Sequence, residues 1–246
     1  MTILPPAQAE KATGVQQHWR TFLETTIDAR LARCTTRSPE NYVLNLFHRT
    51  VDDVPAYRAF VQRAAIDAGT ICTFDDFRAL PLLTRENYIN AFPLPDRCRN
   101  GKVESNDMVA VSSGSTGTPT LWLRSLADEL EITSRFEQIF YDSFQADVHS
   151  TLAVICFPLG TWVGGMFTTN CCRWLAAKGY KVTVVTPGNN AEEIFRAVQS
   201  LAPMFEQTVL LGYPPFVKDV VDRGTAPGVL WINFNIKIVF GGEVFG

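Results

Sequence analysis

Residues 152–185 read LAVICFPLGTWVGGMFTTNCCRWLAAKGYKVTVV, and this stretch decides the fold. It begins with the uninterrupted apolar run Leu152–Phe157, which is typical of a strand buried on both faces. Residues 162–178 have the composition of a helix, and Gly179 stands where helices commonly end. A second strand is predicted over residues 181–185. A strand, a helix and a strand in this order predict two parallel strands joined by a helical crossover.

The same alternation continues along the rest of the chain. Asn190 is a good N-cap for a helix that runs to Leu201, and strands are predicted over residues 208–211 and 236–240 with a helix over 214–223 between them. We therefore predict an α/β fold with a mostly parallel sheet flanked by helices. Its crossovers should be right-handed, and its ligands should bind where the carboxyl ends of the strands meet.

The first part of the chain has a helical composition. A helix is expected over residues 7–33, because apolar residues recur there near helical spacing. Ser38-Pro39-Glu40 is a helix-start signal, and another short helix is expected over 57–68. We predict two regions. Residues 1–105 form a helical N-terminal segment that packs on the core, and residues 106–246 form the α/β region.

A loop rich in glycine and hydroxyl side chains, Val111–Thr120 (VSSGSTGTPT), precedes a helix predicted over residues 128–144. Glycine lets the backbone approach a ligand, and N–H groups with Ser and Thr hydroxyls can surround phosphate oxygens without a fixed charge. The loop matches neither G-x-x-x-x-G-K-[ST] nor G-x-G-x-x-G, and an ordinary surface turn is the alternative interpretation. The residues predicted to bind ATP are Ser112, Ser113, Gly114, Ser115, Thr116 and Gly117.

Three further segments directly follow predicted strands: Pro158–Gly160, Gly212–Pro214 and Gly241–Glu243. Carboxyl ends of parallel strands meet at one edge of a sheet, so we expect these segments to surround one site. Packing at a strand end is the alternative role for Tyr213, and an exposed turn is the alternative for Glu243. The candidate site residues outside the loop are Trp162, Gly164, Tyr213, Gly241, Gly242 and Glu243.

Ordered short motifs carry a resemblance to a known family. The loop Val111–Thr120 resembles the phosphate-binding signature of the AMP-forming adenylating enzymes, the acyl-CoA synthetase superfamily. Residues 54–58 (VPAYR) and 74–86 (FDDFRALPLLTRE) are similar to the N-terminal region of its phenylacetate-CoA ligase-like branch. Gly212-Tyr213-Pro214-Pro215 and Gly241-Gly242-Glu243 stand where that branch has elements beside the nucleotide. The matches cover residues from about 54 to 243.

The resemblance implies an ATP-dependent ligase that uses Mg²⁺ and coenzyme A. A small-molecule carboxylic acid would attack the α-phosphorus of ATP, and the thiol of coenzyme A would then displace AMP. Loop hydroxyls would hold the phosphates, with Thr116 also at the metal, while Gly241–Glu243 would contact the nucleotide. Tyr213, Trp162 and Gly164 would line the acid pocket. The superfamily has lysine at the position of Thr120, and its phenylacetate branch often has lysine at that of Thr118. Both are threonine here, so this loop lacks the side-chain charge that the resemblance would imply.

The family's sequences are longer than this chain. An element that holds adenine and magnesium, a ribose-binding Asp, and a C-terminal domain with a catalytic lysine are not identified before Gly246. The chain is therefore expected to be an N-terminal fragment, and its catalytic residues stay unknown. Neither the acid nor the thiol acceptor can be chosen from the sequence, and whether the fragment turns over alone is open.

Composition excludes several classes of protein. The chain has 246 residues, 46% of them hydrophobic and 19% charged, which is enough for a sizeable core. A net charge of −3 with scattered basic residues argues against nucleic-acid binding.

The sequence also bears on localisation and on the cysteines. No signal peptide is found. The longest apolar stretch, 151–169, is interrupted by proline and glycine, which argues against a membrane span. Both observations favour a cytoplasmic protein. The cysteines lack metal or disulfide spacing and are expected to be reduced and mostly buried. The oligomeric state stays open.

Two other classes of function remain possible from the sequence. A serine hydrolase would use Ser115 as its nucleophile, because Ser113–Gly117 is close to G-x-S-x-G. The histidine that follows, His149, stands two residues after Asp147, which does not suit a triad built from separate strand-end loops. The other alternative is a non-catalytic remnant or binding module of the same fold.

Overall fold

The computed structural model describes residues 6–36, 38–104, 106–112, 119–224 and 228–242. The chain divides into two compact units, each considered separately. The first, here called the sheet unit, comprises Met1–Thr25, Ala110–Ser113 and Leu126–Gly246, and the second, the helical unit, comprises Thr26–Val109 and Gly114–Ser125. The division into 1–105 and 106–246 stays a prediction about domains. The compact units differ from it in grouping the first helix with the sheet.

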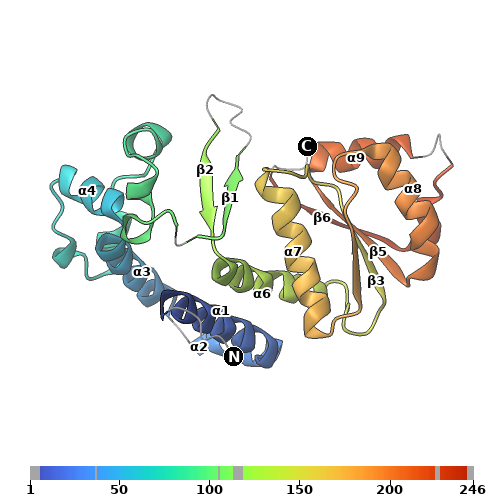
Figure 1. The fold of residues 1–246 in the computed structure, drawn as a ribbon, viewed down its shortest axis with the longest axis horizontal. Helices are drawn as coiled ribbons and strands as arrows, with labels where there is room; N and C mark the ends of the chain where they lie inside the picture. The colour runs from blue at the N-terminus through green and yellow to red at the C-terminus, as the bar shows by residue number, and fades with distance from the viewer. Residues whose placement is uncertain (1–5, 37, 105, 113–118, 225–227, 243–246) are drawn as a thin grey trace. The chain divides into compact units, whose positions relative to one another are not determined.

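The sheet unit is built on a four-stranded parallel sheet (Figure 1). Its order is β4-β3-β5-β6, so β3 and β5 are central. Thr151 pairs with Val182 on one side and with Gln207 on the other, and Thr208 pairs with Ile236. The strands are β3 (Thr151–Ile155), β4 (Val182–Val185), β5 (Gln207–Gly212) and β6 (Ile236–Phe240).

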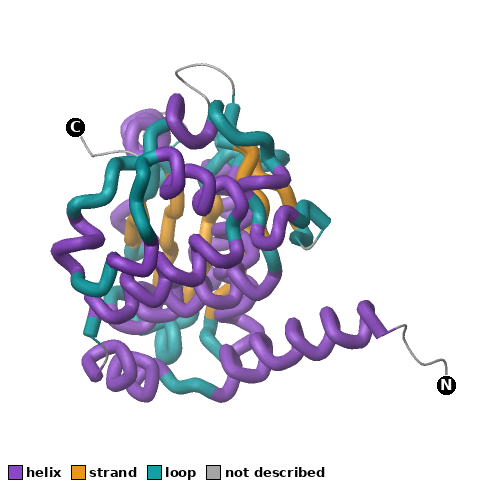
Figure 2. The backbone as a smooth tube through the Cα atoms, turned by 90° about the vertical axis from the view of Figure 1, so that its left-hand side faces the viewer, coloured by secondary structure: helices purple, strands orange, loops and turns teal. Residues whose placement is uncertain are grey.

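Helices cover both faces of this sheet, and Figure 2 shows the strands as neighbouring orange segments among them. One apolar cluster joins Ala153, Ile155 and Val209 to buried residues of α6 and α7, and the other joins Leu152, Val154 and Leu210 to α8 and α9. Alternate residues of each central strand thus face opposite layers, and both strands are fully buried. The helices of this unit are α1 (Pro6–Glu24), α6 (Leu126–Asp142), α7 (Val163–Lys178), α8 (Ala191–Leu201) and α9 (Pro214–Arg223).

Local signals set the ends of these helices. Gly179 follows α7 with φ +106°, the left-handed conformation that glycine adopts easily. Asn190 caps α8, since its side chain accepts a hydrogen bond from the N–H of Glu193. Pro214 opens α9, where its missing N–H costs nothing. The predicted positions of these helices and strands are confirmed within one or two residues.

The helical unit packs around its own apolar cluster of Phe47, Ala56, Phe60, Val61, Ile71 and Phe92. Its α-helices are α2 (Ile27–Thr36), α3 (Pro39–Asp53), α4 (Pro55–Arg63) and α5 (Phe74–Arg78). β1 (Met108–Val111) and β2 (Leu121–Arg124) form a two-stranded sheet. Short helical turns in the chain are Ala68–Thr70, Arg85–Ile89, Pro95–Arg97, Arg99–Gly101, Ala202–Met204 and Trp231–Phe234.

Two predicted helices differ from the structure. The helix predicted over 7–33 is two helices, because Thr26 accepts a hydrogen bond from the N–H of Ala29 through its Oγ1 and so caps a new start. The helix predicted over 57–68 begins at Pro55 and ends at Arg63, since Ala65 takes the left-handed φ of +54°. The helix predicted from Ser38 is confirmed, with Ser38 as its N-cap.

Most of the cysteines are buried, as the composition led us to expect. All six cysteines are free; Cys98, Cys156, Cys171 and Cys172 are buried, while Cys34 and Cys72 are exposed. Burial raises the pKa of the Cys171 thiol to about 12, so it is not a reactive thiolate. Every helix in the described ranges is too short or too polar to cross a bilayer.

Candidate functional site

The carboxyl edge of the parallel sheet brings together the segments that follow its strands. Ile155 pairs with Leu211, and Gly212 pairs with Phe240, so β3, β5 and β6 end side by side. The N–H of Gly188, after β4, donates a hydrogen bond to the carbonyl oxygen of Ile155 at 3.0 Å. The strand exits therefore share one edge, as the alternation of strands and helices predicted.

Tyr213 lies beside the glycines that follow β6. The N–H of Gly241 donates to the carbonyl oxygen of Gly212 at 3.2 Å. A Cβ on Gly242 would lie 3.6 Å from Cδ2 of Tyr213. The φ of Gly242 is +101°, which L side chains rarely adopt, so the turn favours glycine there. The predicted site residues Tyr213, Gly241 and Gly242 are thus neighbours in space, although about thirty residues separate them in sequence.

The start of the glycine-rich loop reaches the same edge. The N–H of Val111 donates a hydrogen bond to the carbonyl oxygen of Thr161 at 2.8 Å, and Val111 pairs with Trp162 as an isolated parallel bridge. Ser112 therefore leaves β1 beside the start of α7. Trp162 occupies the N-cap position of α7 and is 39% exposed. The structure thus brings Ser112, Trp162 and Gly164 to the edge that also holds Tyr213.

Some of the predicted site residues lie outside the described part of the chain. These are Ser113, Gly114, Ser115, Thr116, Gly117 and Glu243. Their contacts, including the metal contact expected of Thr116, stay predictions. Thr120 is buried, and Arg124, the basic residue nearest the loop, lies on β2 in the helical unit.

The described strand exits contain no charged side chain. Residues 156–165, 186–188, 212–213 and 241–242 are apolar residues, glycines, prolines and hydroxyl or phenol side chains. An anion at this edge would be held by backbone N–H groups and hydroxyls. The first turn of α7 adds backbone N–H groups at the positive end of the helix dipole, and the side chain of its N-cap, Trp162, makes no capping hydrogen bond. Within the described ranges, no three His, Cys, Asp or Glu side chains gather as metal ligands.

Glycine is required where these segments approach one another closely. A Cβ on Gly165 would lie 2.2 Å from the carbonyl oxygen of Pro158, and a Cβ on Gly212 would lie 2.9 Å from Cβ of Cys156. Neither distance is tolerable without movement of the chain. Sequence reasoning did not single out Phe157 and Gly188, which also lie at this edge. The glycines that follow the strands in the sequence are the signal from which these close approaches could have been predicted.

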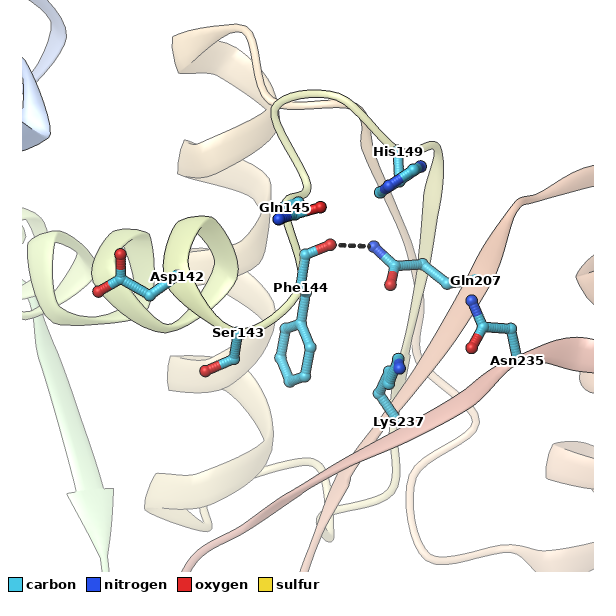
Figure 3. A pocket seen from close by; sticks show the side chains of 8 residues that line it. All are labelled: Asp142, Ser143, Phe144, Gln145, His149, Gln207, Asn235 and Lys237. Atoms are coloured by element: carbon cyan, nitrogen blue, oxygen red, sulfur yellow. Dashed lines mark hydrogen bonds between the residues drawn. The ribbon is translucent and has the colours of Figure 1, made fainter.

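A polar pocket of about 180 Å³ lies at the opposite, amino edge of the sheet (Figure 3). The amide nitrogen of buried Gln207 donates to the carbonyl oxygen of Phe144 at 2.6 Å and to Oγ1 of Thr151 at 2.8 Å. These bonds join the end of α6 to the starts of β3 and β5. Its lining contains no predicted site residue: Asp142, Ser143, Phe144, Gln145, His149, Gln207, Asn235 and Lys237.

His149 lies at this amino edge too, which disfavours a hydrolase. Its Nδ1 is 3.3 Å from Oε1 of Glu206, and Oε2 of Glu206 accepts a 2.7 Å hydrogen bond from the N–H of Ser150. The bond from the Ser150 N–H, with those from the side chains of His149 and Ser150, lowers the pKa of Glu206 to about 2. The loop that contains Ser115 begins at the carboxyl edge with Ser112. A triad of Ser115 and His149 would need both residues at one edge.

The similarity of this chain to known proteins lies in its fold. No family model matches the sequence, and no curated protein matches it. Solved structures of 2-hydroxyisobutyryl-CoA ligase do resemble the chain. One is an open conformation in complex with 2-HIB-AMP and CoA, with a TM-score of 0.65 and 18% identity; the match covers 82% of this chain and 46% of the ligase. Another is the complex with 2-HIB-AMP and CoA in the thioesterification state, with a TM-score of 0.64 and 17% identity; the match covers 98% of this chain and 48% of the ligase.

A third structure of that ligase, in the postadenylation state with 2-HIB-AMP, has a TM-score of 0.64 and 18% identity, covering 81% of this chain and 41% of that one. Likeness at such identities establishes a shared fold. The predicted α/β class, with a parallel sheet flanked by helices, is therefore confirmed. The chain spans less than half the length of each of these structures.

Proposed function

We propose that this chain belongs to an ATP-dependent, AMP-forming ligase that joins a small carboxylic acid to coenzyme A. The observation that carries the proposal is the meeting of Ser112, Tyr213 and Gly241–Gly242 at the carboxyl edge of one parallel sheet. Ligands of open α/β sheets bind at such an edge. The likeness to a ligase solved with 2-HIB-AMP and CoA adds support from the fold.

The finer proposal is an aryl or arylacetic acid as substrate, as in the phenylacetate-CoA ligase-like branch. Large apolar side chains stay partly exposed around this edge: Leu159 is 36% exposed, Trp162 39% and Met166 38%. Exposed apolar groups beside glycine-rich backbone can bury an aromatic ring. The sequence motifs at residues 54–58 and 74–86 support the same branch.

The protein's contribution to adenylation would be positioning. Hydroxyls of Ser112, Ser113, Ser115 and Thr116 would hold the β and γ phosphates, while Gly114 and Gly117 let the backbone approach them. Gly241, Gly242 and Glu243 would contact the nucleotide. The acid, held beside Trp162, Gly164 and Tyr213, would then face the α-phosphorus in line with the departing pyrophosphate. Coenzyme A would attack the adenylate in the second stage, releasing AMP.

Charge neutralisation at this edge needs more than the described residues supply. Its side chains carry no positive charge, so the hydroxyl and N–H donors fit phosphate oxygens but leave the charge uncompensated. Magnesium bound at the phosphates, with Thr116 as its proposed protein ligand, would supply positive charge there. Adenylation also requires a cation at the α-phosphate, which we expect to be a lysine outside the described strand exits.

Calorimetric titration of the chain with ATP and MgCl₂ tests the proposal. We expect weak, saturable binding that disappears when magnesium is chelated. GTP serves as the control nucleotide, since a generic phosphate site would bind both equally. Absence of ATP binding by a folded chain, or equal binding of GTP, would remove the basis of the proposal. Acid-dependent exchange of pyrophosphate into ATP, measured with phenylacetate, benzoate and a short aliphatic acid, would then rank the acids.

A further inference from the structure

The residues that leave β3 pack against glycines from several other segments. This β3 exit, Cys156–Leu159, is the central meeting point of the carboxyl edge. A Cβ on each of these glycines would lie within 3.5 Å of the β3 exit, and within 3.0 Å in two cases. The glycines come from the start of α7, the segment after β4, the end of β5 and the segment after β6: Gly164, Gly165, Gly188, Gly212 and Gly241.

Phe157 contacts two of these glycines with opposite ends of its ring. A Cβ on Gly164 would lie 3.1 Å from Cδ1 and 3.2 Å from Cγ, at the base of the ring. A Cβ on Gly241 would lie 3.5 Å from Cζ, the tip. The half-buried ring also packs against the apolar cluster under α6 and α7. One side chain therefore spans from the first turn of α7 to the segment after β6.

This arrangement makes the ring a rigid link. A phenyl ring does not bend, so a displacement at its base moves its tip. A methyl group on Gly164 would lie 3.1 Å from Cδ1 at the base of the Phe157 ring, which is closer than most observed Cβ contacts. The ring would therefore have to move by a few tenths of an ångström. Close packing passes such a shift to the next neighbour, which here is the backbone at Gly241.

We infer that Phe157 is a positioning residue that couples the start of α7 to the Gly241–Gly242 segment. The effect of this coupling on ligand binding rests on the proposed function, in which the acid lies beside Gly164 and the nucleotide beside Gly241. The ring would then set the distance between the two substrates, and the size of residue 157 would tune both sites together. No contact of Phe157 with ATP is required.

Amide NMR of the whole chain tests the coupling without any ligand. Phe157→Tyr adds a hydroxyl at the ring tip facing Gly241, and Phe157→Leu removes the tip while keeping an apolar side chain. Gly164→Ala pushes on the ring base. We expect the Gly241 and Gly242 amide signals to move in Phe157→Tyr and Gly164→Ala. Combining Gly164→Ala with Phe157→Leu should abolish the movement that Gly164→Ala causes.

Unmoved Gly241 and Gly242 signals in both the Tyr and the Gly164→Ala variants would overturn the inference. So would a Gly164→Ala shift that persists in the Phe157→Leu background. If Gly164→Ala does not fold, the comparison of Phe157→Tyr with Phe157→Leu decides. In the functional arm, Phe157→Tyr should raise the Kd for Mg-ATP roughly tenfold, while Ser200→Ala on α8 leaves it unchanged. A parent chain that binds no ATP would refute the proposed function, yet the NMR result would still decide the coupling.

Discussion

The N–H of Val111 donates a 2.8 Å hydrogen bond to the carbonyl oxygen of Thr161. The bond joins the last residue of β1, where the glycine-rich loop begins, to the segment that starts α7. Fifty residues of sequence separate the two groups. Because Thr161 follows β3 at the carboxyl edge, the bond fixes where the chain enters the loop. The loop therefore starts at the edge that the strand exits share.

Replacing Gly114 or Gly117 with valine should weaken Mg-ATP binding. A β-branched side chain would block the backbone's approach to phosphate and disfavours the conformations that glycine allows. We expect at least roughly a tenfold rise in the Kd measured by calorimetry. Cys171→Ala, which changes a buried residue in the middle of α7, is the control and should bind as the parent does. Unchanged ATP affinity in both folded glycine variants would make the loop an ordinary surface turn.

Gly165→Ala should destabilise the fold because its Cβ would meet a backbone atom. The new methyl would lie 2.2 Å from the carbonyl oxygen of Pro158, which cannot rotate away as a side chain could. Overpacking of this kind costs about 1–3 kcal/mol of unfolding free energy. Gly14→Ala is the matched control: nothing lies within 4 Å of its Cβ, and removing a helical glycine should stabilise α1 by about 0.5–1 kcal/mol. If urea unfolding shows that both substitutions change the unfolding free energy with the same sign, the close approach of Gly165 to the Pro158 carbonyl does not control stability.

Much of the sheet unit could be predicted because its signals are local. Gly179 and Asn190 mark helix ends through their own backbone preferences, and Pro214 marks a helix start. The continuous apolar run at β3 predicted a strand buried on both faces, and the structure confirms it. Because strands alternate with helices along the chain, the sequence predicts parallel strands, whose carboxyl ends share one edge of the sheet. This reasoning placed Tyr213 beside Gly241 without any knowledge of the contact between them.

One local helix cap and the long-range packing were not predicted. The break between α1 and α2 depends on the cap supplied by Thr26, which looked like another residue of a helical run. The grouping of α1 with the sheet depends on contacts such as that of Lys178 Nζ with the carbonyl oxygen of Thr25, 153 residues apart. The sequence placed Phe157 at the end of an apolar run and gave no signal for the contacts of its ring. Its significance comes from two glycines that are distant in sequence and adjacent in space.

Lys178→Met should destabilise the sheet unit strongly. Lys178 Nζ lies 2.7 Å from Oε1 of Glu137, and the two side chains are only 8% and 2% exposed. Removing the ammonium leaves a buried carboxylate without its ion pair, which costs about 3–5 kcal/mol. Adding Glu137→Met should recover part of the loss, since the unpaired charge is gone, although Tyr180 then loses its acceptor.

The control for this pair is Lys218→Met, which breaks an exposed i,i+4 pair with Asp222. Such exposed pairs contribute little to stability, because water and salt screen the attraction between the charges. Chemical denaturation of the parent, Lys178→Met, the double variant Lys178→Met/Glu137→Met and Lys218→Met gives the comparison of unfolding free energies. If the Lys178 change costs no more than the Lys218 change, the buried pair contributes little to the stability of the unit.

Glu206→Gln should flatten the acid limb of the stability curve. The N–H of Ser150, with the side chains of His149 and Ser150, lowers the pKa of Glu206 from 4.5 to about 2. Because the folded-state pKa is lower than the unfolded one, the contribution is fully present above pH 4.5 and is lost as the pH falls toward 2. The carboxylate joins the segment before β3 to the start of β5, so its protonation should loosen the amino edge of the sheet.

Thermal unfolding between pH 6 and pH 2 measures this effect. The fall in Tm should be smaller for Glu206→Gln than for the parent. The control is Glu86→Gln, which changes an exposed residue of the helical unit and should follow the parent curve. Parallel curves for the parent and the Glu206 variant would mean that these hydrogen bonds exert no control over stability in acid.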